Sequence, residues 1–319
     1  MNQTVQLLKA LAEPTRLRIV ALCRAGGDLA VSEFVRILGQ SQPRVSRHLK
    51  LLTEAGALAR IPEGSWVFYR INDAGPSLGI VNALIENIPE DDIIFQRDRE
   101  RLAAVKREHA EAAEAFFSAN ARVWGEIRDM HVDQKEVNKA LERLFGDQPR
   151  DALLDIGTGT GDMLSLFARR IERGEGIDMS RDMLAVARAT LEAEGLSHCR
   201  VRQGDLYSLP YESGEFDTVL IHQVLHYIDD VTAAIVEAAR MLSPGGRLLI
   251  ADFAPHEVEE LRSTYQHRRL GFADFDFDSA FADAGLKLDG IDHLKGDPLT
   301  VVIWSAHKAH SDAEKVAAQ

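Results

Sequence analysis

The stretch LLDIGTGTGDML, residues 153–164, limits the choice of folds more than any other part of the chain. An apolar run ends in Asp155, glycines follow at positions 157, 159 and 161, and an amphipathic pattern begins after them. A strand, a glycine-rich turn and a helix in this order are typical of an α/β sheet. Because glycine has no Cβ, such a turn lets a ligand come close to the backbone.

The residues around this turn alternate between strand patterns and helix patterns. Strands are predicted at 152–157, 174–179, 199–205, 216–223 and 246–253, with helical segments between them. Residues 286–307 are expected to add a closing antiparallel pair. The predicted fold class is therefore α/β, with a Rossmann-like, doubly wound parallel sheet over residues 135–308.

Acidic residues near the glycine turn narrow the choice of ligand. A dinucleotide-binding pattern, G-x-G-x-x-G/A, would place Asp162 against a pyrophosphate, which a carboxylate repels. Asp178 ends the second strand, where it can accept from ribose hydroxyls, and Asp205 ends the third, where it can accept from an adenine amino group. A cationic ligand without phosphate fits better, and we expect S-adenosylmethionine (SAM) or its demethylated product S-adenosylhomocysteine (SAH). The predicted ligand-binding residues are Asp155, Gly157, Thr158, Gly159, Gly161, Asp178, Met179, Asp205, Leu206 and His222.

The N-terminal residues predict a different architecture. Helices are expected within 4–25, broken around Glu13-Pro14, and at 31–38 and 41–55, with strands following at 57–61 and 66–71. The strands are joined by a turn at Pro62–Ser65. Short helices, a reading helix and a β-hairpin in this order form a winged helix-turn-helix.

The helix expected at 41–55 has one apolar and one polar face. Residues 36–70 hold six basic and two acidic side chains. Arg and Gln reach base edges in DNA, while Ser, Lys and further Arg hold phosphates. The predicted DNA-binding residues are Gln42, Arg44, Ser46, Arg47, His48 and Lys50 on this helix, with Arg60 and Arg70 flanking the hairpin. A solvated helix face on a protein-interaction domain is the alternative interpretation.

Charge and composition extend the prediction to the whole chain. Residues 1–90 hold ten basic and eight acidic residues, a balance of +2, whereas the whole chain has a net charge of −13. The rest of the chain therefore carries −15 and would not attract nucleic acid. We expect a DNA-binding domain at 1–88, a helical linker or dimerisation arm at 89–134 with one long helix over 90–130, a ligand-binding domain at 135–308 and a flexible tail at 309–319. Two distant cysteines, no signal segment and no long apolar run favour a cytoplasmic protein without a membrane partner.

The N-terminal motifs resemble those of a known repressor family. LKALAEPTRLRIVALC and SQPRVSRHLKLLTEAGALARIPEGSWVFYRI are similar to ArsR/SmtB-type winged-helix regulators. The resemblance implies a homodimer that releases double-stranded operator DNA when an inducer binds. Many relatives bind metal through a thiolate pair, but VSEFVRILG contains no cysteine, so no metal site is expected.

The C-terminal motifs resemble those of class I SAM-dependent methyltransferases. LLDIGTGTG, EGIDMS, GDLYSLPYESGEFD and LSPGGRLLIADF occur in the order that this family shows. The segment IHQVLHYIDD lacks the Pro-Pro-aromatic motif of amino-methylating DNA enzymes. Methylation of a cytosine carbon needs a cysteine nucleophile, and none lies near this segment, while methylation of arsenic needs more cysteines than the chain has. A small molecule is therefore the expected methyl acceptor, if the domain transfers a methyl group.

Three histidines, His222, His256 and His267, are the candidate catalytic residues. The spacing of His256, Glu260 and His267 predicts that they share one face of a helix, as a general base with its orienting partner, a substrate clamp or a metal site. Chance histidines on a solvated helix are the alternative. Two functions stay open: a repressor whose methyltransferase-type domain senses SAM or SAH, and an active methyltransferase of a small molecule with a DNA-binding module.

Overall fold

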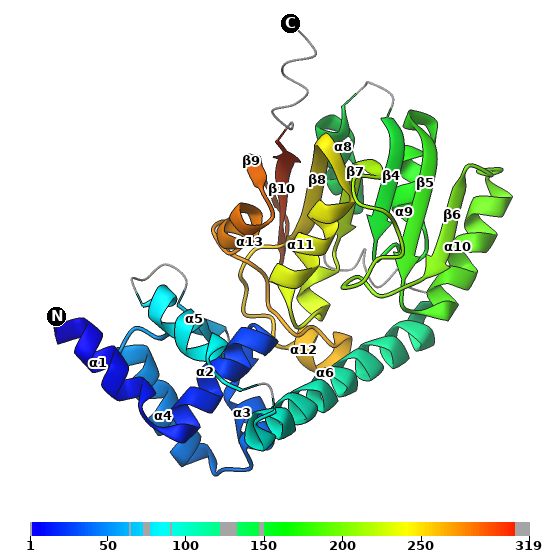
Figure 1. Cartoon of the computed structure of the whole chain (residues 1–319). Coiled ribbons are helices and arrows are strands. Elements are labelled where there is room, and N and C mark those ends of the chain that lie inside the picture. The colour runs from blue at the N-terminus through cyan, green and yellow to red at the C-terminus, as the bar shows by residue number, and fades with distance from the viewer. Residues whose placement is uncertain are drawn as a thin grey trace, which may run out of the picture. The chain divides into compact units, whose positions relative to one another are not determined.

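The structure, a computed structural model, describes residues 2–63, 65–72, 77–89, 91–121, 133–146 and 150–309. The chain forms two compact units, Met1–Glu111 and Ala112–Gln319 (Figure 1). The predicted tail at 309–319 lies outside the described residues except for Ala309. None of the described helices combines the length and the apolar character needed to cross a membrane.

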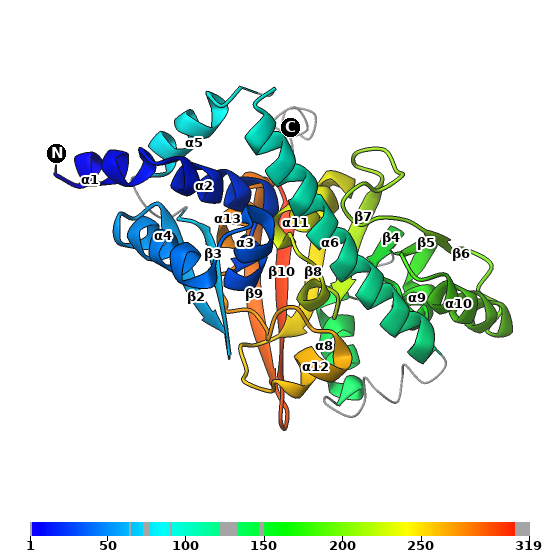
Figure 2. The same ribbon diagram turned by 90° about the horizontal axis from the view of Figure 1, so that it is seen from below.

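The first unit is helical, with a small three-stranded sheet (Figure 2). Its first helices are α1 (Asn2–Leu11), α2 (Pro14–Gly26), α3 (Val31–Leu38), α4 (Gln42–Glu54) and α5 (Leu78–Glu86). Its strands are β1 (Leu29–Ala30), β2 (Leu58–Glu63) and β3 (Trp66–Ile71), in the order β1-β3-β2. The helices and the hairpin predicted for a winged helix-turn-helix are therefore present.

Local sequence explains where these elements begin and end. The Glu13 carboxylate caps α2 by accepting from the Arg16 N–H at 2.9 Å, and Pro14 takes the first helical position. Gly39 ends α3 in the left-handed conformation. β2 runs past its predicted end, so Pro62 lies in a strand instead of the predicted turn. An edge strand tolerates proline, because the missing N–H faces no neighbouring strand.

Helix α6 (Ile93–Asn120) forms most of the long helix predicted over 90–130, and residues 122–132 lie outside the described range. Leu102 and Val105 on α6 are buried in the core of the first unit. Asp98 on the same helix pairs with Arg18 of α2, with an N–O distance of 2.6 Å. The beginning of the predicted linker is therefore packed against the helix-turn-helix.

The second unit holds a seven-stranded sheet in the order β6-β5-β4-β7-β8-β10-β9 (Figure 1). Its strands are β4 (Arg150–Ile156), β5 (Ile171–Asp178), β6 (Cys199–Gln203), β7 (Phe216–His222), β8 (Leu242–Phe253), β9 (Leu286–Lys295) and β10 (Thr300–Lys308). β4 to β8 are mutually parallel, whereas β10 pairs antiparallel with both β8 and β9. The predicted α/β fold with a closing antiparallel pair is confirmed.

Helices cover both faces of this sheet. α11 (Val231–Met241) and α13 (Asp278–Asp283) pack on one face, and α8 (Gln134–Phe145), α9 (Asp162–Phe167) and α10 (Arg181–Ala193) pack on the other. Successive side chains of β4 alternate between the two cores: Leu154 contacts the first and Leu153 the second. The loops that follow the parallel strands lie at the carboxyl edge of the sheet, which is where α/β proteins bind ligands.

One boundary differs clearly from the sequence expectation. The helix expected over MLSLFARRI ends at Phe167, and a short 3-10 turn leads into β5 at Ile171. β5 begins this early because Ile171 already lies opposite Arg150 in the parallel pairing with β4. Pairing with a neighbouring strand thus ends a helix that local periodicity alone would continue.

Candidate functional site

The glycine turn between β4 and α9 is shaped by its backbone. Gly157, Gly159 and Gly161 have positive φ angles of 72°, 52° and 83°. A Cβ at Gly157 would lie 2.3 Å from a methyl carbon of Val224, so no larger residue fits there. The Gly157 N–H donates to the Ile177 carbonyl of β5 at 2.7 Å. The turn therefore lies against β5 on one side and against the segment after β7 on the other.

Two of the predicted carboxylates are hydrogen-bonded to this turn. Asp155 is 1% exposed and accepts from the Thr158 hydroxyl at 2.6 Å. Asp178, at the end of β5, accepts from the N–H groups of Gly159 and Ser180 at 2.9 and 2.8 Å. Burial raises the pKa of Asp178, although these backbone N–H groups oppose the shift. Each oxygen of the Asp178 carboxylate accepts one of these N–H groups, so each oxygen can still accept a hydrogen bond from a ligand hydroxyl.

The third predicted carboxylate follows the neighbouring strand. Because β6, β5 and β4 are adjacent and parallel, Asp205, Asp178 and Asp155 follow one another along the carboxyl edge of the sheet. Asp205 and Met179 are exposed, and Leu206 is half-buried. The predicted ligand-binding residues therefore lie at one edge of the sheet, in the order expected from the strand order.

Two buried glutamines at the same edge were not among the predicted binding residues. Gln223 directly follows β7 with a φ of 56°, a conformation that residues other than glycine rarely adopt. Gln134, the first residue of α8, donates to Gln223 Oε1 at 3.5 Å. Each side chain is 7% exposed, and within the described part of the chain Gln134 Oε1 and Gln223 Nε2 have no hydrogen-bond partner. Since unpaired buried polar atoms are costly, the pair can offer one acceptor and one donor to a ligand.

The prediction that His256, Glu260 and His267 share one helical face is wrong. α12 covers Glu260–Tyr265, so His256 precedes this helix and His267 follows it. The His256 N–H donates to the Leu270 carbonyl at 3.0 Å, which turns the backbone away from a helical path. Both imidazoles nevertheless lie beside Phe253, at centroid distances of 6.1 and 5.9 Å.

A buried imidazole–carboxylate pair adjoins these rings. Asp252, fully buried in β8, accepts from His226 Nδ1 at 2.7 Å and from the Leu225 N–H at 3.0 Å. The carboxylate fixes the tautomer of His226 with the proton on Nδ1. The His226 ring stacks on His267 with centroids 4.0 Å apart. His222, 8% exposed, ends the neighbouring β7. The sequence contains no sign of the pair, because its members are 26 residues apart on different elements.

Helix α4 provides a separate candidate surface in the first unit. Val45, Leu49 and Leu52 form its buried face. The exposed side chains of the predicted set on this helix are Gln42, Arg44, Ser46, Arg47 and Lys50. Arg60 in β2 is also exposed, and Arg70 in β3 is half-buried. These side chains give the unit a basic surface beside its hairpin.

His48 differs from the other residues predicted to face DNA. It is half-buried, and its Nδ1 lies 3.5 Å from the Glu13 carboxylate at the start of α2. Burial lowers the pKa of His48, while the Glu13 charge raises it. The His48 side chain therefore lies between α4 and the start of α2, where it can connect the two helices.

Comparison with known proteins assigns both units. A family model described as a helix-turn-helix domain matches residues 11–61, and one described as a methyltransferase domain matches residues 154–250. The arsenical resistance operon repressor of Escherichia coli is 47% identical over 73 residues, which are 23% of this chain and 62% of the repressor. The chain joins an ArsR-type helix-turn-helix domain to a methyltransferase domain.

The methyltransferase domain is similar to several named enzymes. The demethylmenaquinone methyltransferase of Thermus thermophilus is 36% identical over 129 residues, 40% of this chain and 56% of that enzyme. A ubiquinone/menaquinone biosynthesis C-methyltransferase of Teredinibacter turnerae is 35% identical over 126 residues, 38% of this chain and 51% of that enzyme. The chain thus spans about half the length of these curated relatives.

A solved structure supports the fold of the methyltransferase domain. It is the complex between the Haloferax volcanii Trm112 methyltransferase activator and a methyltransferase, in which one chain matches with a TM-score of 0.51. The match is 23% identical in sequence and covers 61% of this chain and 98% of that one. At this identity the similarity concerns the fold alone.

Proposed function

We propose that the chain is a DNA-binding transcriptional regulator, acting as a repressor, whose methyltransferase domain binds SAM or SAH as its signal. Helix α4 carries the proposal, because its apolar face is buried while Gln42, Arg44 and Arg47 stay exposed. Such side chains suit base edges and phosphates of duplex DNA. The name of the repressor from Escherichia coli is consistent with this role.

The ligand proposal rests on the polar groups at the carboxyl edge of the sheet. Asp178 can accept from the ribose hydroxyls, and the exposed Asp205 can accept from the adenine amino group. Gln134 Oε1 and Gln223 Nε2 suit the ammonium and the carboxylate of the amino-acid tail. The buried Asp155 beside the turn disfavours a phosphate. When bound, SAM supplies a methyl group on a positively charged sulfur.

We also propose that the protein acts as a homodimer. Operator DNA with two half-sites requires two reading helices about 34–36 Å apart or a multiple of that distance. Val5 and Leu8 on α1 are 43% and 45% exposed, which leaves apolar surface on the first unit for a second copy.

An active methyltransferase of a small molecule is the second candidate. The His226–Asp252 pair and the stacked His267 lie near the carboxyl ends of β7 and β8. Those strands lie on the side of β4 opposite β5, which carries Asp178. A histidine in such a place can take a proton from an acceptor hydroxyl or amine. The relatives named as methyltransferases favour this reading.

Operator binding with and without ligand separates the two functions. An operator is first selected from random duplex DNA with the full-length protein, and DNA affinity is then measured alone, with SAM and with SAH. We expect one of the ligands to change the affinity by about fivefold or more, as is typical of coupled sites. If neither ligand shifts the affinity and the methyl label of SAM appears in a small acceptor, the regulator proposal is wrong and the enzyme proposal holds.

A further inference from the structure

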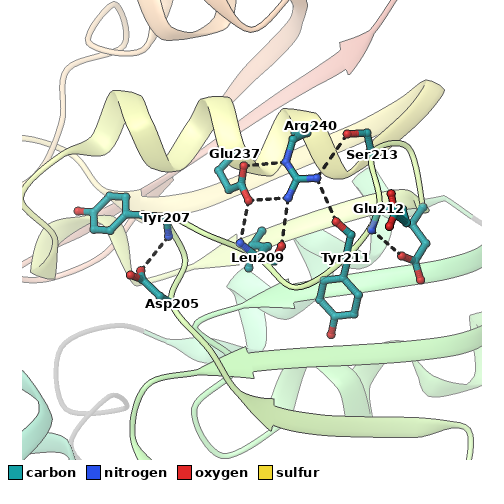
Figure 3. A network of polar contacts seen from close by, with 9 residues as sticks. Asp205, Tyr207, Leu209, Tyr211, Glu212, Ser213, Glu237 and Arg240 are labelled. Carbon is teal, nitrogen blue, oxygen red and sulfur yellow. Dashed lines mark hydrogen bonds and ion pairs between the residues drawn. The ribbon is translucent and has the colours of Figure 1, made fainter.

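The loop between β6 and β7 carries Asp205 and Leu206, the residues proposed to face the nucleobase. Its first residues are hydrogen-bonded to each other and to the start of α11. Asp205 accepts from the Tyr207 N–H at 2.9 Å, and the Tyr207 hydroxyl accepts from the Asp230 N–H at 3.0 Å. Residues 209–213 of the loop are held by two side chains of α11 (Figure 3).

Arg240 uses every N–H of its guanidinium in these contacts. Nε and Nη2 donate to the two carboxylate oxygens of Glu237 at 2.8 and 2.7 Å, which makes a bidentate pair on α11. Nη2 also donates to the Leu209 carbonyl at 3.1 Å. Nη1 donates to the Tyr211 carbonyl at 3.0 Å and to the Ser213 hydroxyl at 3.3 Å. A guanidinium has five N–H donors, so none is left for another partner.

Glu237 completes the attachment of the loop. Its Oε1 accepts from the Leu209 N–H at 2.7 Å, so both backbone polar groups of Leu209 are bound to the same ion pair. Hydrogen bonding to Arg240 lowers the pKa of Glu237, which keeps the carboxylate charged at neutral pH. The Leu209 side chain is 4% exposed and packs in the core beside α11. The loop is therefore held to α11 by hydrogen bonds to its backbone and by the buried side chain of Leu209.

We propose that Arg240 and Glu237 are positioning residues that set the affinity of the site for the adenine ring. The inference rests on the proposed function, because it concerns the same SAM or SAH site. Both side chains bind the loop backbone, so they act on the nucleobase through Asp205 and Leu206. A loop that is already ordered loses less conformational entropy when a ligand binds to it. The resulting gain in binding free energy applies only to ligands that contain the adenine ring, because that ring is the part that the loop contacts.

Two ligands that differ only in the base test this proposal. SAH contains adenine, whereas S-ribosylhomocysteine has the same ribose and amino-acid tail without it. For Arg240→Met we expect SAH affinity to fall by about tenfold, in line with losing hydrogen bonds to a charged group. The affinity for S-ribosylhomocysteine should stay unchanged. Arg240→Lys should remain impaired for SAH, since an ammonium cannot reproduce the planar fork.

Arg170→Met is the matched control. Arg170 also pairs with a glutamate in the second unit, Glu142, at 3.4 Å, but neither residue belongs to the loop or contacts it in the described structure. This variant should bind both ligands as the wild type does. Calorimetric titration of the full-length protein gives all of these affinities, and circular dichroism confirms that each variant is folded.

The outcomes separate the inference from the proposed function. Equal losses for SAH and S-ribosylhomocysteine, or unchanged SAH affinity in Arg240→Met, overturn the positioning role while the SAH site stands. Wild-type protein that binds neither ligand overturns both. If Arg240→Met does not fold, Glu237→Gln replaces it, because its amide oxygen can still accept from Leu209 while the ion pair is lost. A selective loss of SAH affinity in that variant supports the proposal, and no loss contradicts it.

Discussion

The half-buried carboxyl group of Asp178 should make the proposed SAM or SAH binding sensitive to acid. Burial raises the pKa of Asp178, whereas ribose hydroxyls that donate to the carboxylate would favour its ionised form. The proposed ligand should therefore lower this pKa, so that the protonated protein would have to release a proton to bind it. As the pH falls below the raised pKa of Asp178, we expect SAH affinity to drop by about tenfold per pH unit. Titration calorimetry of the full-length protein from neutral to mildly acidic pH measures this slope.

Asp178→Asn removes the titrating group and should give a weaker but pH-independent affinity. Asp182→Asn is the control, because that carboxylate lies four residues further along, on the exposed side of α10. It should keep the wild-type slope. A slope that survives in Asp178→Asn would assign the titration to another group.

The two buried glutamines lead to a second prediction at the level of single residues. Replacing Gln134 by Leu removes a buried amide oxygen that has no partner but also the 3.5 Å hydrogen bond to Gln223 Oε1, so these two effects oppose each other and the free energy of unfolding should change little. SAH affinity should fall by about tenfold, since the ammonium loses its acceptor. Binding of 5′-methylthioadenosine, which has no amino-acid tail, should be unchanged. If both ligands lose affinity equally, the amide does not recognise the tail.

At the level of elements, α4 should act through its exposed side chains. Arg47→Ala should weaken operator binding and reduce the slope of log affinity against log salt by about one if Arg47 contacts a phosphate. His48→Ala should have a smaller effect on DNA binding, because His48 is half-buried against Glu13. Fluorescence anisotropy at several salt concentrations measures both variants. An unchanged affinity in Arg47→Ala would show that the reading face lies elsewhere.

Elements with local signals could be predicted from the sequence, whereas those set by distant contacts could not. α3 covers the predicted 31–38, because its apolar spacing is regular and Gly39 ends it. The segment from His256 to His267 has helical spacing too, but hydrogen bonds to residues far along the chain interrupt it. The backbone N–H groups of Arg268 and Arg269, for example, donate to the His226 carbonyl. The local spacing of apolar residues cannot reveal hydrogen bonds to residues so far along the chain.

The sequence also predicted only part of the candidate site. The glycines and the three carboxylates lie at or just after the carboxyl end of a strand, so their positions on the parallel sheet could be predicted from the sequence. Gln134 was not among the predicted residues, although the helical spacing places it on the same buried face of α8 as Val137 and Leu141. A polar residue on such an apolar face is unusual and could have drawn attention to it. Its partner Gln223 is 89 residues away, which only the folded chain reveals.

At the level of the whole molecule, α6 is a covalent connection between the two units. It begins at Ile93 in the first unit and ends at Asn120 in the second. In the first unit Leu102 is buried in the helix-turn-helix core. In the second unit the Phe117 and Tyr227 rings are in contact, with centroids 4.7 Å apart, and Tyr227 also contacts the rings of His226 and His267. If the proposed SAM or SAH signal reaches the DNA-binding unit, α6 is the helix through which we expect it to pass.

Ala112→Pro tests this connection, because proline inside a helix removes a hydrogen bond and kinks the backbone. Position 112 lies where the second unit begins. If SAH controls operator binding through α6, the variant should keep its ligand-free DNA affinity and its SAH affinity, while SAH no longer changes the DNA affinity. Ala112→Ser, which a helix tolerates, should respond to SAH as the wild type does. A proline variant that still responds would show that the signal reaches the DNA-binding unit without an intact α6.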